Sequence, residues 1–278
     1  MSRHSGADPD PRFGNHLLRV NLLIVALLGT AACQSRPAAR SGYLTTYAGM
    51  PSPDRPLNGA AHRRRDDNAS DAIQQVYIQP AVLETGIEME FSEREKAMIL
   101  REVDRQICFE VSKRFSIAPG PSPDAGTIRT AIVRMRTNSR VGSAAEAAID
   151  FFNPIPIVIF RLPSTTGGLA IESELLDPAG AQIAAIAWRR NARMIGRIKP
   201  SLSKAGDALQ LAEPLGDSVA NAFATKARPK IKIGNPDPCE RFGPRKSIKR
   251  SLAGGVVGGA TGLYVPQVAG TSVKKEKD

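Results

Sequence analysis

Leu169–Leu176 (LAIESELL) and Gln182–Arg193 (QIAAIAWRRNAR) are the two stretches of the sequence that decide its fold class. Both are rich in apolar and β-branched residues, as is typical of β-strands. Between them lies Asp177-Pro178-Ala179-Gly180, in which proline suits the second position of a β-turn and glycine tolerates a positive φ. The sequence therefore predicts a β-hairpin here.

Further strands and helices are expected on both sides of the hairpin. In chain order they are a strand at Val76–Glu84, a helix behind the capping box Ser92-Glu93-Arg94-Glu95, a strand at Thr127–Thr137, an Ala-rich helix at Ser143–Phe152, an apolar stretch at Ile155–Leu162 and a helix at Lys204–Lys226. Pro156 limits its stretch to an edge strand or a loop on the core, and Pro214 should kink or split the last helix. The order β-α-β-α-β-β-β-α predicts an α+β fold, with a single antiparallel or mixed β-sheet and helices packed on one face.

The first 32 residues have the pattern of a secretory signal peptide. A basic start is followed by the apolar stretch Leu22–Leu28 and by small residues that end at Ala32. This apolar stretch is too short to span a bilayer, which takes about 20 helical residues. The chain accordingly divides into a lipoprotein signal peptide (1–32), a tether or linker (33–71), an α+β globular domain (72–228) and a basic, Gly-rich, flexible tail (229–278).

Cys33 directly follows the small residues and resembles the lipidated cysteine of the bacterial lipobox. In such a lipobox the thiol receives a diacylglyceryl group, the chain is cut before the cysteine, and the new amine is acylated, typically with palmitate. Thr30 stands where leucine is usual, so a soluble periplasmic protein remains the alternative. Gln34, rather than Asp, after the cysteine is typical of lipoproteins released to the outer membrane.

Ser41–Tyr47 (SGYLTTY) stands out within the linker, because aromatic and apolar residues in such a place usually dock on something. After a lipobox, this stretch resembles the opening S-G-[FY]-L-x-x-Y of a family of uncharacterised Gram-negative lipoproteins, catalogued as a domain of unknown function. Val76–Pro80 and Ala205–Ala208 agree with that family. The resemblance covers roughly residues 41–228 and implies a lipoprotein associated with the outer membrane, but it supplies no catalytic residue.

Histidine is missing from the predicted globular domain. His4 and His16 lie in the signal peptide and His62 lies in the linker. Serine–histidine and cysteine–histidine catalysis need an imidazole base, and zinc sites need His and Cys at short spacings. Glu172 and Glu174 share one strand face, where a solvated strand surface is a better interpretation than an acid–base pair. We therefore expect no enzyme, no metal and no cofactor.

Cys108 and Cys239 are the cysteines that remain after lipidation of Cys33. The periplasm is oxidising, so these two could form a disulfide that attaches part of the tail to the domain. The alternative is that Cys108 is a small buried residue without a disulfide.

Arginines recur on two of the predicted strands. Arg134 and Arg136 share one face, with Arg140 just beyond them, and Arg189 and Arg193 share a face of another strand. If those strands are neighbours, the guanidinium groups would form a patch able to bind carboxylates or phosphates. We favour the alternative of an exposed sheet face whose charge is balanced by the acidic pair.

The tail is basic, with ten Lys and Arg against four Asp and Glu after residue 228. Its stretch Leu252–Val265 resembles a glycine zipper, since Gly254, Gly258 and Gly262 recur every four residues. Glycine is a poor helix former, so a flexible tail is the favoured interpretation. In the envelope a basic chain meets phospholipid head groups, lipopolysaccharide and peptidoglycan, and nucleic acid is not expected as a partner.

These patterns predict a lipoprotein anchored through Cys33 at the periplasmic face of the outer membrane, acting as a non-catalytic interaction module. Its expected partners are the membrane and an envelope protein or peptidoglycan. One alternative is a cell-wall enzyme or an activator of such an enzyme. Another is a structural lipoprotein whose glycine-zipper-like tail associates with membranes.

Overall fold

The computed structural model describes residues 40–53, 59–85, 90–137, 159–160, 166–192, 195–196 and 204–243. All of these belong to one compact unit, Ser35–Asp278. Several predicted features lie outside the described residues, namely the signal peptide with Cys33, the helix at Ser143–Phe152, Arg140, Arg193 and the glycine-rich stretch Leu252–Val265.

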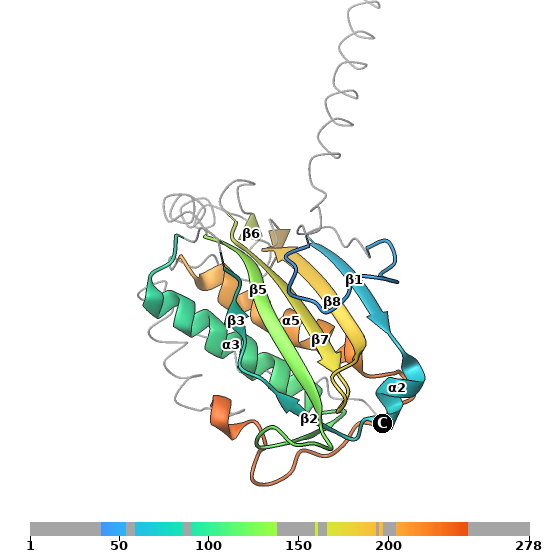
Figure 1. The fold of residues 1–278 in the computed structure, drawn as a ribbon. Helices are drawn as coiled ribbons and strands as arrows, with labels where there is room; N and C mark the ends of the chain where they lie inside the picture. Colours follow the sequence, from blue (N-terminus) through green and yellow to red (C-terminus); the bar gives the residue numbers. More distant parts are fainter. Residues whose placement is uncertain are drawn as a thin grey trace, which may run out of the picture. The chain divides into compact units, whose positions relative to one another are not determined.

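The fold is built on one mixed sheet of seven strands (Figure 1). Its strands are β1 (Gly59–Arg65), β2 (Gln75–Ile78), β3 (Val82–Leu83), β4 (Ser116–Ile117), β5 (Gly126–Arg136), β7 (Gly168–Leu176) and β8 (Gln182–Asn191). They run in the order β1-β8-β7-β5-β2-β4, with β3 also paired to β5. β1, β8, β7 and β5 are antiparallel neighbours, whereas β2 and β3 run parallel to β5. A separate pair joins β6 (Ile159–Phe160) and β9 (Ile195–Gly196). The predicted α+β class with a mixed sheet is confirmed.

The hairpin that decides the fold class is formed by β7 and β8. Gly180 has a φ of 85° and donates its N–H to the Asp177 carbonyl at 2.9 Å. A side chain is disfavoured at that φ, which is why glycine stands there. The predicted strand at Val76–Glu84 is interrupted and becomes β2 and β3, because Pro80 between them cannot donate to a ladder.

Two long helices, α3 (Glu93–Val111) and α5 (Gly206–Phe223), pack together behind the sheet (Figure 1). The predicted capping box is present, since Ser92 accepts from the Glu95 N–H and the Glu95 carboxylate accepts from the Ser92 N–H. Helix α5 continues through Pro214, so the proline does not split it. Its buried side, including Leu215 and Val219, packs into the core, and this packing outweighs the one backbone hydrogen bond that proline cannot make.

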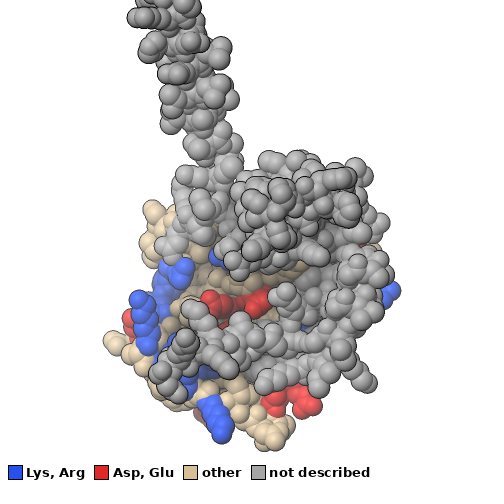
Figure 2. Space-filling model, turned by 180° about the vertical axis from the view of Figure 1, so that it is seen from behind, with Lys and Arg blue, Asp and Glu red and all other residues tan. Residues whose placement is uncertain are grey.

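Figure 2 shows the molecule from behind, with a group of acidic side chains gathered on this side. The carboxylate of Glu213 on α5 is repelled by the carboxylates of Glu110 on α3 and of Asp217, one turn further along α5. Burial, with the repulsion from these two carboxylates, raises the pKa of Glu213 above its ordinary value.

Residues 59–71 correct the prediction of a tether for this part of the chain. They form the edge strand β1 and the short helix α2 (Asp67–Ala72), whose N-cap Asp66 accepts from the Ala69 N–H. Arg65 donates to the carbonyls of Asn221, Ala222 and Ala224 at the end of α5 at 2.8–3.1 Å, where a helix dipole favours positive charge. An edge strand needs only backbone pairing with β8, so a charged, arginine-rich sequence can form it.

Residues 229–243 likewise correct the prediction of a flexible tail for that part of the chain. Of the two alternatives for the cysteines, the structure contains the Cys108–Cys239 disulfide. Cys239 is fully buried and begins the 3-10 helix η1 (Glu240–Phe242). Arg241 of η1 donates to the carbonyls of Ile78 and Pro119, each at 2.8 Å. These contacts join the segment to the domain.

Gly216 lets α3 and α5 pack closely. A Cβ at this position would lie 2.5 Å from the carbonyl oxygen of Gln106, which is backbone and cannot swing aside. We expect Gly216→Ala to lower the free energy of unfolding by about 1–3 kcal/mol, although alanine is the better helix former by about 1 kcal/mol. Denaturant unfolding measures the change.

Gly120→Ala is the matched control, because a Cβ at Gly120 meets nothing within 4 Å. Its free energy of unfolding should stay within about 0.5 kcal/mol of the wild type. Equal stability of Gly216→Ala and Gly120→Ala would contradict the close approach of the two helices.

Candidate functional site

The sheet face opposite α3 and α5, here called the outer face, carries the candidate functional side chains, which are acidic residues and arginines. Residues paired across antiparallel strands point to the same side, which places the outer-face positions in four rows. From one end to the other these rows are Arg129–Glu174–Ala185, Ala131–Glu172–Ala187, Arg134–Ala170–Arg189 and Arg136–Gly168–Asn191, each from β5 to β7 to β8. Acidic residues thus occupy β7 in the first two rows, and small residues occupy it in the last two.

Residues 41–47, here called the docked segment, lie on the two acidic rows. Ser41 binds Glu172 twice, through its N–H at 3.2 Å and its hydroxyl at 2.6 Å. Thr45 binds Glu174 in the same way, through its N–H at 2.8 Å and its hydroxyl at 3.1 Å. Leu44 between them is only 4% exposed. The prediction that this stretch docks is confirmed by these contacts.

Tyr47 closes the docked segment into a loop. Its hydroxyl donates to Glu172 at 2.6 Å and accepts the Gly42 N–H at 2.8 Å. Burial and the hydrogen bond to Glu172 raise the pKa of Tyr47. Gly42 has a φ of 94°, a value that side-chain-bearing residues rarely adopt. The loop therefore depends on glycine at position 42 and on a protonated tyrosine at position 47.

Glu174 is the centre of a buried network. It is fully buried and pairs with Arg129, while Gln182 donates to it at 2.6 Å. Burial alone would raise the pKa of Glu174, but hydrogen bonds from Gln182, Thr45 and Arg129 outweigh it and hold the pKa below the ordinary value. Arg129 also lies over the Tyr43 ring, 5.3 Å from its centre, and burial raises the pKa of Tyr43 to about 12. Glu174 is therefore ionised and fully engaged inside the protein.

The interpretation of Glu172 and Glu174 as a solvated strand face is wrong. They are 2% and 0% exposed, because the docked segment covers them. The tyrosines of the docked segment distinguish it in the sequence, but no local pattern connects it with these carboxylates, which lie about 130 residues away along the chain. A pair of acidic residues among small and apolar neighbours in the same strand was the sequence signal that could have indicated buried carboxylates.

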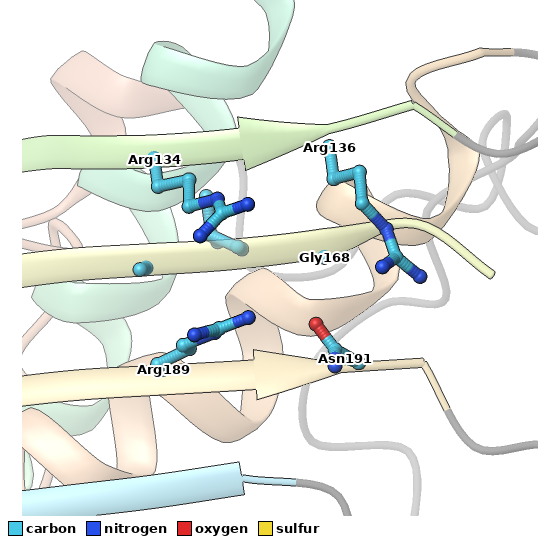
Figure 3. A pocket seen from close by; sticks show the side chains of 7 residues that line it. Arg134, Arg136, Gly168, Arg189 and Asn191 are labelled. Atoms are coloured by element: carbon cyan, nitrogen blue, oxygen red, sulfur yellow. The ribbon is translucent and has the colours of Figure 1, made fainter. Parts of the chain in front are cut away.

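The arginines predicted as a patch come together only in part. Arg134 and Arg136 of β5 and Arg189 of β8 line one small pocket with Gly168, Ala170 and Asn191 (Figure 3). β5 and β8 are not adjacent, since β7 lies between them. The arginines nevertheless line one pocket, although the patch was expected only for neighbouring strands. Burial, together with repulsion from Arg134 and Arg136, lowers the pKa of Arg189.

Within the described ranges, no group of three or more His, Cys, Asp or Glu residues is placed to hold a metal ion. The same part of the chain contains no helix that is both long and apolar enough to cross a membrane. His62 lies on the edge strand β1 with its Nδ1 2.9 Å from the Pro51 carbonyl oxygen.

In the described part of the chain, an open mixed sheet has helices on one face and the docked segment on the other, which is an α+β fold. The chain belongs to the family described as "Protein of unknown function (DUF3313)", whose model matches residues 39–219. The matched region includes the docked segment and both carboxylates that bind it. Among curated protein sequences, none matches this chain.

The chain is also similar to solved structures of the PelC dodecamer from Paraburkholderia phytofirmans. Two crystal forms match with 13% sequence identity and TM-scores of 0.36 and 0.37. Each match covers 60% of this chain and 99% of the PelC chain.

Proposed function

We propose that this protein is a lipoprotein anchored through an acylated Cys33 at the periplasmic face of the outer membrane, where it acts as a non-catalytic interaction module. The signal pattern that ends at Ala32 and the cysteine after it support the anchor. Two or more acyl chains hold a protein on a membrane stably.

The docked segment is the observation that carries this proposal. Ser41 is bound to the sheet through Glu172, and it follows Cys33 by only eight residues. Eight residues span at most about 28 Å even when fully extended. The domain would therefore stay close to the bilayer, instead of moving at the end of a tether of nearly forty residues. Such an arrangement suits a module that meets its partner at the membrane surface.

The described chemistry supports a non-catalytic role. The candidates for an acid–base pair on the sheet are Glu172 and Glu174. Both are buried and bound by the docked segment. A general base must be within reach of a substrate proton, and these groups are covered. The partner would be an envelope protein or peptidoglycan.

Metabolic labelling with a fatty-acid analogue tests the anchor. The wild type should incorporate the label and fractionate with outer membranes, whereas Cys33→Ala should lose the label. Gln34→Asp is the matched control, because it should keep the label while moving the protein to the inner membrane. Labelling of Cys33→Ala at the wild-type level would overturn the proposal.

Crosslinking of intact cells tests the interaction role. A discrete set of crosslinked envelope partners should be recovered with the wild type and lost with Cys33→Ala, whose domain is unchanged but no longer held at the membrane. Recovery of no partner from well-expressed wild-type protein would count against an interaction module.

A further inference from the structure

The last two rows of the outer face bring three arginines to one place. Arg134 and Arg189 lie in register on either side of Ala170, and Arg136 lies in the next row opposite Asn191 with Gly168 between them. Figure 3 shows the side chains of Arg134 and Arg189 extending toward each other over the middle strand. Two strand spacings separate β5 from β8, roughly 9–10 Å, a gap that two arginine side chains can close from both sides.

The small residues of β7 form the floor of this pocket. Ala170 and Gly168 are buried and small, and together with the arginines and Asn191 they line the pocket. A Cβ at Gly168 would lie 2.6 Å from the Asn191 amide oxygen, so a larger residue would displace Asn191. The guanidinium of Arg136 is held in place by the Thr166 carbonyl, which accepts from its Nε at 2.9 Å. The cationic groups are thus positioned by the sheet and its immediate neighbours.

The two halves of the outer face differ in the residues that β7 contributes. In the acidic rows Arg129 pairs with Glu174, and Glu172 is satisfied by the docked segment. In the arginine rows the facing positions on β7 are alanine and glycine, so β7 places no carboxylate between the guanidinium groups. The guanidinium groups of Arg134 and Arg136 repel that of Arg189, and an anion bound among the three would reduce this repulsion.

We propose that Arg134, Arg136, Arg189 and Asn191 form a binding site for a phosphate group. Guanidinium groups pair with phosphate oxygens through two parallel hydrogen bonds. A tetrahedral phosphate offers oxygens in several directions and can be held by arginines from opposite sides, whereas a planar carboxylate has only two oxygens. The phosphate could belong to a lipid head group or to a soluble phosphorylated molecule.

Phosphate binding to the purified full chain tests the site. We would measure the unfolding temperature and the calorimetric affinity for pyrophosphate, with chloride at equal ionic strength as the reference. Pyrophosphate should raise the unfolding temperature of the wild type, and Arg134→Gln and Arg189→Gln should each weaken its affinity at least about ten-fold. Arg94→Gln and Arg101→Gln, which remove the same charge from exposed positions of α3, should leave the affinity within about two-fold.

Unfolding temperatures measured without ligand distinguish an arginine that binds phosphate from an arginine that stabilises the fold. Without phosphate and at low salt, Arg134→Gln should unfold at the same or a higher temperature than the wild type, because a repulsive charge is removed. A structural arginine would show the opposite. The proposal is overturned by a wild type that does not respond to pyrophosphate, or by equal loss of affinity in Arg134→Gln and Arg101→Gln.

Vesicles distinguish the two sources of phosphate. The Cys33→Ala variant, which has no lipid of its own, is mixed with vesicles containing phosphatidic acid. Binding that pyrophosphate displaces and Arg134→Gln abolishes assigns the site to lipid phosphate. Binding of pyrophosphate in solution without vesicle binding assigns it to a soluble phosphorylated ligand. Neither arm depends on acylation, so the site can stand even where the labelling experiment fails.

Discussion

Replacing Glu174 with alanine is expected to lower the free energy of unfolding by about 3–5 kcal/mol, the cost of breaking a buried ion pair by removing one partner. The substitution takes the acceptor away from Arg129, Gln182 and the Thr45 N–H at once. It also removes one of the two carboxylates that hold the docked segment. Denaturant unfolding measures the loss of stability, and trypsin cleavage after Arg40 measures release of the segment.

Two further variants show whether the charge or the shape of Glu174 matters. Glu174→Gln keeps an acceptor for Thr45 and should cost less than the alanine variant. Glu93→Ala removes an exposed carboxylate that pairs with Lys96, and the stability of this variant should differ from that of the wild type by less than about 1 kcal/mol. If Glu174→Ala were as stable as Glu93→Ala and equally resistant to trypsin, the buried network would have no structural role.

The same network has a defined pH dependence. The pKa of Glu174 lies below its ordinary value of 4.5 in the folded protein. Its contribution is therefore fully present above the unfolded-state pKa and is lost as the pH falls through the lower folded-state pKa. The stability difference between wild type and Glu174→Gln should accordingly shrink in that acidic range and stay constant around neutral pH.

Removing the Cys108–Cys239 disulfide is expected to lower the free energy of unfolding by about 2–5 kcal/mol, because the bond closes a long loop in the unfolded chain. The two cysteines are 131 residues apart. The loss should also free η1, so that Arg241 no longer binds the carbonyls of Ile78 and Pro119. The measurement compares unfolding of the wild type with that of the double variant Cys108→Ser, Cys239→Ser.

A reducing agent provides the control for this comparison. It should lower the unfolding midpoint of the wild type to that of the double variant and leave the double variant unchanged. A native wild type in which Cys108 and Cys239 both react with a thiol reagent, or a midpoint unaffected by reduction, would contradict the disulfide.

Local patterns accounted for much of the fold. The hairpin of β7 and β8 follows from its turn residues, and the start of α3 follows from the capping box at Ser92. Both depend on contacts between residues a few positions apart, which the sequence displays directly. The shared face of Arg134 and Arg136 was predicted on the same ground, since a strand places alternate residues on one side.

Long-range pairing was not visible in this way. β1 carries little hydrophobic alternation, and its place in the sheet comes from backbone pairing with β8, more than a hundred residues later. Glu172 and Glu174 resembled a solvated face until the docked segment covered them. The choice between a disulfide and a lone buried Cys108 likewise depended on where Cys239 lies in space.

The α+β class, the strands and helices with clear periodicity, and the likeness of Cys33 to a lipidated cysteine could all be predicted from the sequence, because each depends on residues close together in the chain. The binding of residues 41–47 to the sheet, and the pocket that Arg134 and Arg189 line from either side of β7, become visible only in the folded protein. Both features depend on the order and register of the strands, and the periodicity within a single strand determines neither order nor register.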